Sequence, residues 1–577
     1  MAVLNLLLDA VWILAAAIAV LFILLHLTCR SRRKPNEPPL IQGWIPYLGV
    51  ALPFGNRSAR YLLELQRLHG DIFTLLIAGK RITFLMDPSH AVTVLKEAPA
   101  TLSSVHAALT ATERVVGARK LQLLRSCLDE LQRDYVRTLH GTAANDLTRR
   151  FCSKLHHFLD VHPEAMLHSA ARANGGWVQG QLPLVVMSAL LYANTETLFG
   201  DGTWYSDMPQ HYQAFNKSLP LLLAGVPASL IGVDSVRAAI ADAVGGSTVR
   251  SSASTFIKRR WAGFQHSNVD LYNQSRLQLA ALWVANAHTL NTAFWTLYHI
   301  GRDRALQAKL MSEWRQVLRD RWNDQSTSDD ADGDEDEDDS TLPPISDGDE
   351  NADDDDASDG ERDDHRDECK VDGHTSPDSS DASNANANAQ SGFSDAHTFT
   401  PDILRQLHHL ESCIQEVLRL YSSTIITRRA TADLAVCLTD RRVGQREYAI
   451  RQDDYVCVAT ELFHLDPDRF PEPHEFQHNR FLTADGSTKQ FFAADGTEIR
   501  HSFLPFGAGA HKCPGRFYAM NMVKLLVMSL LERFELHVSR DTPVPCVDGR
   551  RAGLGVMNVV DDVPFQYRTR PRGGGSP

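Results

Sequence analysis

The sequence predicts a mainly α-helical fold with small β-sheets and a single N-terminal transmembrane helix. Apolar residues recur at helical spacing through most of the chain between residues 91 and 535. Only short runs, such as 72–74 and 81–85, show the alternation or the branched residues typical of strands. With 577 residues, 43% of them hydrophobic, the chain can bury a large core.

Residues 1–29 are predicted to form a membrane anchor. Val11 to Leu27 is almost wholly apolar and, with the apolar residues before it, gives about 20 residues, enough to cross a bilayer. Basic residues follow at once at positions 30, 32, 33 and 34, and positive charge keeps that side cytoplasmic. We therefore expect a luminal N-terminus and a cytosolic body. A cleaved signal peptide is the alternative, although no small-residue cleavage site is evident.

Residues 30–49 are predicted to be a basic, proline-rich hinge. Prolines stand at 35, 38, 39 and 46, and proline fixes its own backbone while lacking a donor N–H. A stiff hinge of this kind holds the body of the chain against the membrane.

The next part of the chain is predicted to be two strands and then mainly helices. His69–Thr74 and Arg81–Leu85 are the strands, and Ala91–Arg260 shows amphipathic periodicity without chemistry that stands on its own. Ser275–Ile300 is apolar on nearly all faces, which indicates one buried helix. Its middle is polar, with Asn286, His288, Thr289, Asn291 and Thr292.

Residues 323–396 are predicted to be an acidic disordered insertion between two helices. They are rich in Asp, Ser, Gly and Asn, with almost no large apolar residues, and cannot bury enough surface to offset chain entropy. An acidic tail that binds a partner is the alternative.

The chain outside this insertion is basic. Between Asp324 and Asp381 there are 26 acidic and 3 basic residues, so the rest of this chain of net charge −13 carries about +10. A positive charge of this size suits binding to an acidic electron-donor protein or to an anionic membrane face. The alternative is a solvated surface over which the charge is scattered.

The nine cysteines indicate reduced thiols. Their number is odd, their spacing is irregular and no CxxC pair suggests zinc or a redox dithiol. Reduced thiols fit a domain that faces the cytosol.

The loop from Phe506 to Gly515 carries the clearest chemistry, because it leads a cysteine into the apolar, helix-like stretch Arg516–Glu535. Unpaired N–H groups at a helix N-terminus help a thiolate stay ionised. The loop's glycines, Gly507, Gly509 and Gly515, allow tight turns and close approach to a flat cofactor, and Phe506 can shield the sulfur from water. We interpret Cys513 as the axial thiolate of a haem iron, a ligand that favours O–O cleavage. A lone cysteine would be better explained as buried and inert.

The spacing of this loop resembles the haem-binding signature of the cytochrome P-450 superfamily, Phe-x-x-Gly-x-x-x-Cys-x-Gly, with Phe506, Gly509, Cys513 and Gly515 at its fixed positions. The resemblance implies haem b (iron protoporphyrin IX) and the cytochrome P-450 fold. The haem domain would then comprise 50–322 and 397–570, followed by a flexible tail at 571–577. Many members hold a haem propionate with an Arg two residues before the Cys. Here that residue is His511, which could do so only protonated or as a neutral donor.

Three further segments resemble one branch of the superfamily, namely the sterol 7α-hydroxylases, sterol 12α-hydroxylase and prostacyclin synthase. These segments are Glu37–Gly49, His464–Pro467 and the tail from Arg551 to Arg568. The resemblance is weak between Ala91 and Arg260, where most substrate contacts would lie.

The segment Pro401–Tyr421 is predicted to be a helix that carries a structural ion pair. Glu416 and Arg419 share a helix face, so carboxylate and guanidinium can pair. This Glu-x-x-Arg precedes the cysteine loop by about a hundred residues, as in the superfamily, which implies Arg480 as a third member of a buried network. Arg428 follows the helix as the propionate-binding Arg does in relatives.

His288 and Thr289 are the candidate catalytic residues of the predicted central helix. Relatives that cleave dioxygen reductively carry an acid and an alcohol there, and counting from Trp295 places Ala287 and His288 at those positions. The branch usually has Asn in place of the alcohol. We hypothesise that His288 delivers protons; a core histidine satisfied by a helix carbonyl or water is the alternative.

The resemblance implies a membrane-anchored haem-thiolate monooxygenase that hydroxylates a sterol or oxysterol, by analogy at position 7α. Electrons would come from NADPH through NADPH-cytochrome reductase. An endoperoxide isomerase like prostacyclin synthase, which needs no reductase, is the alternative. The missing acid–alcohol pair favours the isomerase, whereas the tail Arg551–Gly555 favours the sterol hydroxylase. A haem protein without turnover is a third class. We expect single-pass anchoring in the endoplasmic reticulum membrane, the bilayer and a sterol or other lipid as partners, and no nucleic acid.

Overall fold

The computed structural model describes residues 2–570 apart from 30, 46, 57, 97–100, 162–174, 247–249, 330–398, 441–443, 484–485 and 487–499. By its internal contacts the chain divides into two units. The first comprises Met1–Val317 and Phe399–Pro577 and holds the sites discussed below; the second is Leu318–Thr398.

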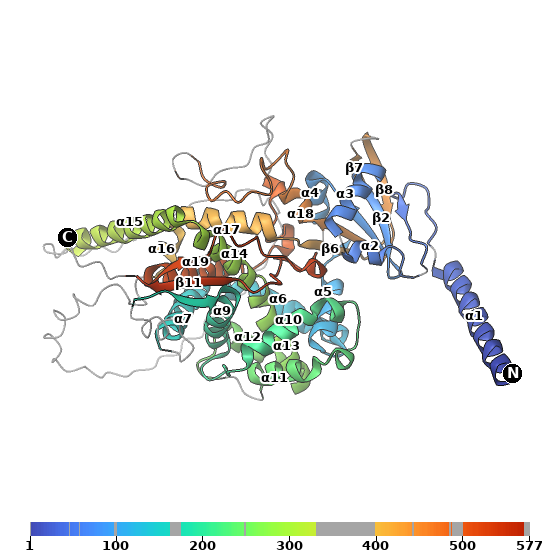
Figure 1. Cartoon of the computed structure of the whole chain (residues 1–577), viewed down its shortest axis with the longest axis horizontal. Coiled ribbons are helices and arrows are strands. Elements are labelled where there is room, and N and C mark those ends of the chain that lie inside the picture. The colour runs from blue at the N-terminus through green and yellow to red at the C-terminus, as the bar shows by residue number, and fades with distance from the viewer. Residues whose placement is uncertain are drawn as a thin grey trace, which may run out of the picture. The chain divides into compact units, whose positions relative to one another are not determined.

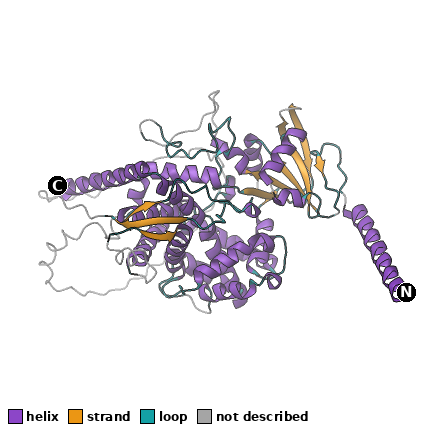
Figure 2. Cartoon of the chain, in the orientation of Figure 1, coloured by secondary structure: helices purple, strands orange, loops and turns teal. Residues whose placement is uncertain are grey.

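Helices dominate the first unit, as Figure 2 shows. Those before the central region are α1 (Ala2–Cys29), α2 (Ala51–Asn56), α3 (Ser58–His69), α4 (Pro88–Lys96), α5 (Val105–Val116), α6 (Arg125–Thr138), α7 (Gly141–Asp160), α9 (Leu182–Phe199), α10 (Met208–Leu223), α11 (Asp234–Val244) and α12 (Thr255–His266). The later helices are α13 (Leu271–Ala287), α14 (Thr289–Arg302), α15 (Arg304–Asp329), α16 (Pro401–Arg405), α17 (His408–Tyr421), α18 (Thr460–His464) and α19 (Arg516–Arg533). The 3-10 turns are η1 (Leu121–Leu124), η2 (Ala228–Ile231), η4 (Arg500–Ser502), η5 (Gly509–His511) and η6 (Gly549–Arg551).

The described strands form three small sheets, of which β2, β6, β7, β8 and β11 are labelled in Figure 1. The largest has the order β1-β2-β3-β9-β6-β4, from Leu40–Ile41, Ile72–Ile77, Lys80–Leu85, Tyr455–Ala459, Ile425–Ala430 and Leu102–Ser103. The second has the order β10-β11-β5, from Phe534–His537, Pro564–Thr569 and Val178–Gln181. The third is the hairpin of β7 (Leu434–Asp440) and β8 (Gly444–Ile450). The fold class expected from sequence, mainly α with small sheets, is confirmed. The predicted strand Arg81–Leu85 lies within β3, whereas the one predicted from His69 to Thr74 begins only at Ile72, because His69 ends α3.

The core of the first unit is built from helices that are apolar on several faces. Helix α14 packs against α9, α17 and α19, and helices without a polar face are stable only when buried. Among the described residues, α9 is the one helix long and apolar enough to cross a membrane, but 78% of it is buried inside the protein. We therefore assign α9 to the core. The predicted anchor lies in α1, whose apolar stretch Trp12–Thr28 is shorter.

The central helix differs from the expectation of one continuous helix over Ser275–Ile300. It is two helices, α13 and α14, which meet at His288. Side chains compete for the backbone carbonyls there: the Asn291 amide donates to the Ala287 carbonyl at 3.0 Å, and the Thr292 hydroxyl to the His288 carbonyl at 2.9 Å. Such hydrogen bonds loosen and bend a helix without changing its apolar periodicity.

Three predicted boundaries are also wrong. The helix expected over Pro401–Tyr421 breaks between α16 and α17, and the one expected over Arg516–Glu535 ends at Arg533, where β10 begins. The acidic insertion, expected from residue 323, begins inside α15, which continues to Asp329. Its remaining residues lie outside the described part of the chain, as does the tail at 571–577.

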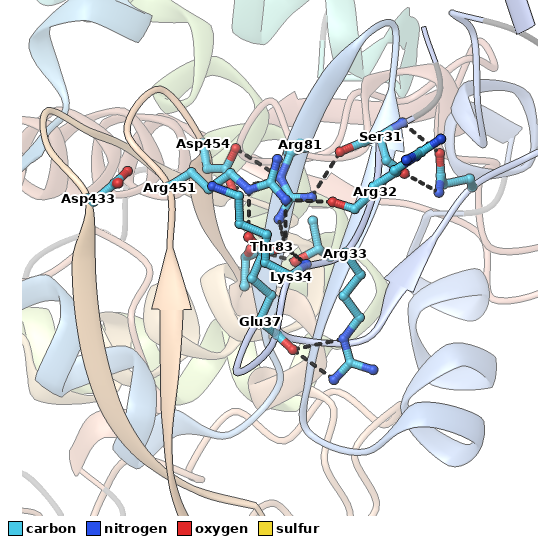
Figure 3. A network of polar contacts seen from close by, with 12 residues as sticks. Ser31, Arg32, Arg33, Lys34, Glu37, Arg81, Thr83, Asp433, Arg451 and Asp454 are labelled. Carbon is cyan, nitrogen blue, oxygen red and sulfur yellow. Dashed lines mark hydrogen bonds and ion pairs between the residues drawn. The ribbon is translucent and has the colours of Figure 1, made fainter. Parts of the chain in front are cut away.

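The predicted hinge is held to the largest sheet by a buried carboxylate, shown in Figure 3. Glu37, only 1% exposed, accepts hydrogen bonds from Arg81 at 3.1 Å and from the Arg451 Nε at 2.5 Å. Arg81 in turn donates to Asp454 at 2.9 Å. The Arg33 guanidinium, although this residue is exposed, donates to the Glu37 carbonyl at 2.8 Å. Ion pairs therefore fix the hinge in addition to its prolines.

Candidate active site

The cysteine loop is closed on itself by a backbone hydrogen bond. The Cys513 N–H donates to the Phe506 carbonyl at 2.9 Å, which joins the two ends of the motif. Gly507 and Gly509 have φ of 75° and 68°, a left-handed conformation that glycine adopts at little cost. Gly515 caps α19 with φ of −85°, which any residue could adopt. The turn thus needs the first two glycines, and close approach of a cofactor remains the predicted reason for the third.

The Cys513 thiol is not activated by the chain alone. Burial raises its pKa above the ordinary value, while the Gly515 backbone N–H and the nearby Arg516 guanidinium lower it. The expected help for the thiolate is therefore present, but burial outweighs it. A coordinated metal cation reverses this balance, because a coordinating thiol is deprotonated.

His511 presents one unused nitrogen beside the loop. The Gln132 side-chain amide, from α6, lies 3.3 Å from the His511 Nδ1. Because an amide nitrogen only donates, Nδ1 accepts and the ring proton resides on Nε2. Nε2 is buried and has no hydrogen-bond partner among the described residues. Burial, and secondly Arg428, lower the pKa of His511, so the ring is neutral. Its Nε2–H is therefore a donor that a bound acceptor could satisfy.

Arg428, on β6, supplies spare donors in the same region. It is 7% exposed, and the one hydrogen bond found for its guanidinium in the described chain goes to the Thr427 carbonyl at 3.1 Å. No carboxylate of the described residues forms an ion pair with it. A buried guanidinium without an acid partner is costly, and an anionic group bound nearby would offset that cost.

A second contact to the loop was not found from sequence. The Arg516 guanidinium lies 3.3 Å from the His140 Nε2, at the start of α7. The His140 Nδ1 lies 2.8 Å from the Val136 carbonyl, so Nδ1 donates and Nε2 accepts. No spacing in the sequence links His140 to Arg516, which follows 376 positions later.

Glu416, Arg419 and Arg480 come together in one buried network. Arg419 donates to both carboxylate oxygens of Glu416 at 2.7 and 2.8 Å, and Arg480 donates to both at 3.0 Å. Both side chains of the helical pair are fully buried, and that of Arg480 is 7% exposed. The other N–H groups of Arg419 and Arg480 donate to backbone carbonyls at the end of α18 and in the segment that follows it. These carbonyls belong to His464, Pro471, Glu472, Pro473 and Glu475. The network therefore fastens this irregular segment to α17.

His288 lies at the break between α13 and α14, against a glycine of the C-terminal tail. A Cβ atom on Gly555 would lie 1.9 Å from the His288 Cε1 and 2.3 Å from its Nδ1, so the imidazole fills that space. Part of the ring is solvent-accessible, whereas enclosure by the protein, with Arg551 second, lowers its pKa to about 4. The two observations agree if the accessible face borders space inside the protein. We treat the ring as neutral at physiological pH.

The Thr289 hydroxyl is less available for catalysis than its position in the sequence suggests. Its hydroxyl donates to the Ala285 carbonyl at 3.3 Å, and the residue is 7% exposed. Asn291 instead connects the central helix to the tail, donating to the Val556 carbonyl at 2.9 Å. No hydrogen bond in the described chain joins His288 or Thr289 to the cysteine loop, so these groups form two separate clusters.

The residues around the cysteine loop fit haem b. A partly accessible thiol, a buried ring N–H without a partner and a guanidinium without an acid match a metal with two anionic propionates. Cys513 would hold the iron, and His511 and Arg428 would hold propionates.

Comparisons with known proteins find one family model and several full-length relatives. Residues 386–562 match the family model named cytochrome P-450. Prostacyclin synthase of Rattus norvegicus is 28% identical, covering 93% of this chain and 95% of that protein. Cholesterol 7-alpha-monooxygenase of Cricetulus griseus is 26% identical, covering 94% and 95%. Cytochrome P-450 7B1 of Mus musculus is 27% identical, covering 99% and 96%.

Proposed function

We propose that this protein hydroxylates a sterol or oxysterol, by analogy at position 7α. The chain carries a cytochrome P-450 domain, which is an oxidoreductase domain with haem b as its cofactor. The observation that carries this proposal is the place of the segment Arg551–Gly555. This segment resembles the sterol hydroxylases, and it lies directly against His288 at the break of the central helix.

The roles of the chain's own residues follow from their contacts. The haem, when bound, supplies the activation of dioxygen with electrons from a redox partner. Cys513 holds the iron, and the Gly515 N–H and Arg516 stabilise the sulfur's negative charge. The neutral His511 donates its Nε2 proton to one propionate and Arg428 binds the other. Glu416, Arg419 and Arg480 act structurally, by holding the segment after α18 in place.

His288 is proposed to hold and pass on protons on the substrate side. Its ring is neutral and part of its surface is accessible, so it can accept a proton from water and give it up again. We propose Thr289 as a residue that keeps the helix break in shape through its hydrogen bond to Ala285.

The membrane setting is proposed from α1 and from the charge that follows it. We infer that α1 crosses the endoplasmic reticulum membrane once and that the catalytic body faces the cytosol, where NADPH-cytochrome reductase supplies electrons. The apolar stretch Trp12–Thr28 and the basic residues after it support this topology.

An endoperoxide isomerase remains the second candidate, because the acid–alcohol pair is missing and a neutral histidine stands in its place. One experiment separates the two: turnover of a sterol panel and of prostaglandin endoperoxide, each with and without reductase and NADPH. We expect a hydroxylated sterol only when both are present. Rearrangement of the endoperoxide without reductase, and no sterol product, would replace the proposal with the isomerase.

A further inference from the structure

Helix α10 contains a backbone carbonyl that its own hydrogen-bond ladder cannot satisfy. Pro220 lies inside the helix and has no N–H to donate to the carbonyl four residues earlier, that of Asn216. A buried carbonyl without a donor costs free energy, so another group must serve it.

Arg551, far away in sequence, serves that carbonyl. Its NH1 donates to the Asn216 carbonyl at 2.5 Å, and its NH2 donates to the Asn216 side-chain oxygen at 3.2 Å. The same oxygen accepts the Trp283 indole N–H from α13 at 3.4 Å. Arg551 is 3% exposed and Asn216 is 9% exposed, so water does not compete for these bonds.

The segment that begins at Arg551 continues to the reaction site. Four residues later comes Gly555, whose missing side chain makes room for the His288 ring. The Ser423 N–H donates to the Gly555 carbonyl at 3.0 Å, and Asn291 donates to the next carbonyl, that of Val556, at 2.9 Å. A shift of Arg551 therefore reaches His288 through a short, well-bonded stretch of backbone.

We propose that Arg551 is a positioning residue that couples the Pro220 break of α10 to the placement of His288. The guanidinium replaces the hydrogen bond that Pro220 removes, and thereby fixes α10 and the Arg551–Gly555 segment to each other. The reaction-side consequence rests on the proposed function, but the coupling itself is a property of the fold.

The test compares Arg551→Met with Arg550→Met in the full-length holoenzyme by amide hydrogen exchange. Arg550 is the matched control, because it neighbours Arg551 but is exposed and, among the described residues, forms its ion pair with Asp548. Arg551→Met should speed exchange in residues 212–224 and 552–558 by roughly 10- to 100-fold, as expected for loss of a buried hydrogen bond to a charged group. Arg550→Met should leave both segments unchanged.

Two further variants separate the coupling from general damage. Pro220→Ala supplies the missing N–H, so in the Arg551→Met background it should restore the protection of α10 but not that of residues 552–558. Product formed per NADPH consumed should fall in Arg551→Met but show no further fall when His288→Asn is already present. Unchanged exchange in Arg551→Met, or equal effects of the two arginine variants, would overturn the inference. Absence of sterol turnover alone would count against the proposed function, since the exchange pattern does not depend on substrate.

Discussion

Cys513 is the proposed ligand of the haem iron, and its raised pKa makes that role testable. Without iron the sulfur is protonated, and ligation must displace that proton. The reduced, carbon-monoxide-bound protein should show the red-shifted Soret band of thiolate ligation, and Cys513→Ser should lose it while Cys437→Ser, at an exposed position, keeps it. Retention of the band in Cys513→Ser would mean that another residue ligates the iron.

His288 is the residue whose role the sequence leaves open. If it passes protons, His288→Ala should lower the product formed per NADPH consumed, within the roughly 10²- to 10⁴-fold range of acid–base groups. If it only fills space against Gly555, His288→Asn should behave as the wild type in both turnover and its pH dependence. Unaltered coupling in His288→Ala, measured as product against NADPH, rules out proton delivery.

At the scale of elements, the contact between the tail and the central helix predicts a non-additive pair of substitutions. Gly555→Ala puts a Cβ within 1.9 Å of the His288 ring and at a φ of +104°, so it should destabilise the protein by about 1–3 kcal/mol. In His288→Ala the clash disappears and only backbone strain remains. Denaturation of the four proteins of this cycle should therefore give a smaller cost for Gly555→Ala in the second background, and equal costs would contradict the contact.

Local signals in the sequence located several elements, and they failed where contacts join distant segments. The pair Glu416–Arg419 was predicted because two residues three positions apart lie on the same face of a helix. The helix break at His288 was missed, because apolar residues continue on both sides of it and the side-chain hydrogen bonds that bend the helix leave no pattern in the sequence. The bonds from Gln132 to His511 and from Arg551 to Asn216 join residues more than 300 positions apart, and no local pattern marks them. Pro220 is one signal that the sequence does contain, since a proline inside a helix leaves the carbonyl four residues earlier without a backbone N–H donor.

At the scale of the whole molecule, buried neutral histidines predict acid lability. Burial lowers the pKa of His156 to about 4, and that of His299 and His464 to about 3, from an ordinary 6.5. The unfolded chain therefore binds more protons below pH 6.5, and stability present above that pH falls as pH decreases toward 4. Glu532, whose pKa burial raises to about 7, acts in the opposite direction, as do Glu313 and Glu461, whose pKa values burial also raises. His299 and His464 have the largest shifts away from their ordinary value, and the three histidines should dominate between pH 5.5 and 7.5.

The melting temperature should thus be lower at pH 5.5 than at pH 7.5. Each histidine contributes up to about 1.4 kcal/mol per pH unit in that window. His299→Gln removes one of the three and should make the decrease smaller. A melting temperature that is constant or rises on acidification would show that these rings are not buried in neutral form.

The acidic insertion gives a second prediction at this scale. Because its composition cannot support a packed core, deleting residues 330–381, which leaves α15 whole, should change neither haem content nor thermal stability. Both are measured on the purified protein, by the reduced carbon-monoxide spectrum and by melting. A large decrease in either would show that the insertion folds onto the rest.

The buried carboxylate of Glu37 also sets an order of events during synthesis. Its partner Arg451 follows 414 residues later in the chain, which at 5–20 residues per second corresponds to roughly 20–80 s of translation. The segment next to α1 emerges from the ribosome first, yet its buried charge has no complete set of partners until most of the protein has been made. During that interval Glu37 must stay in water, and the body of the chain can be fixed to this segment only in one of the last steps of folding.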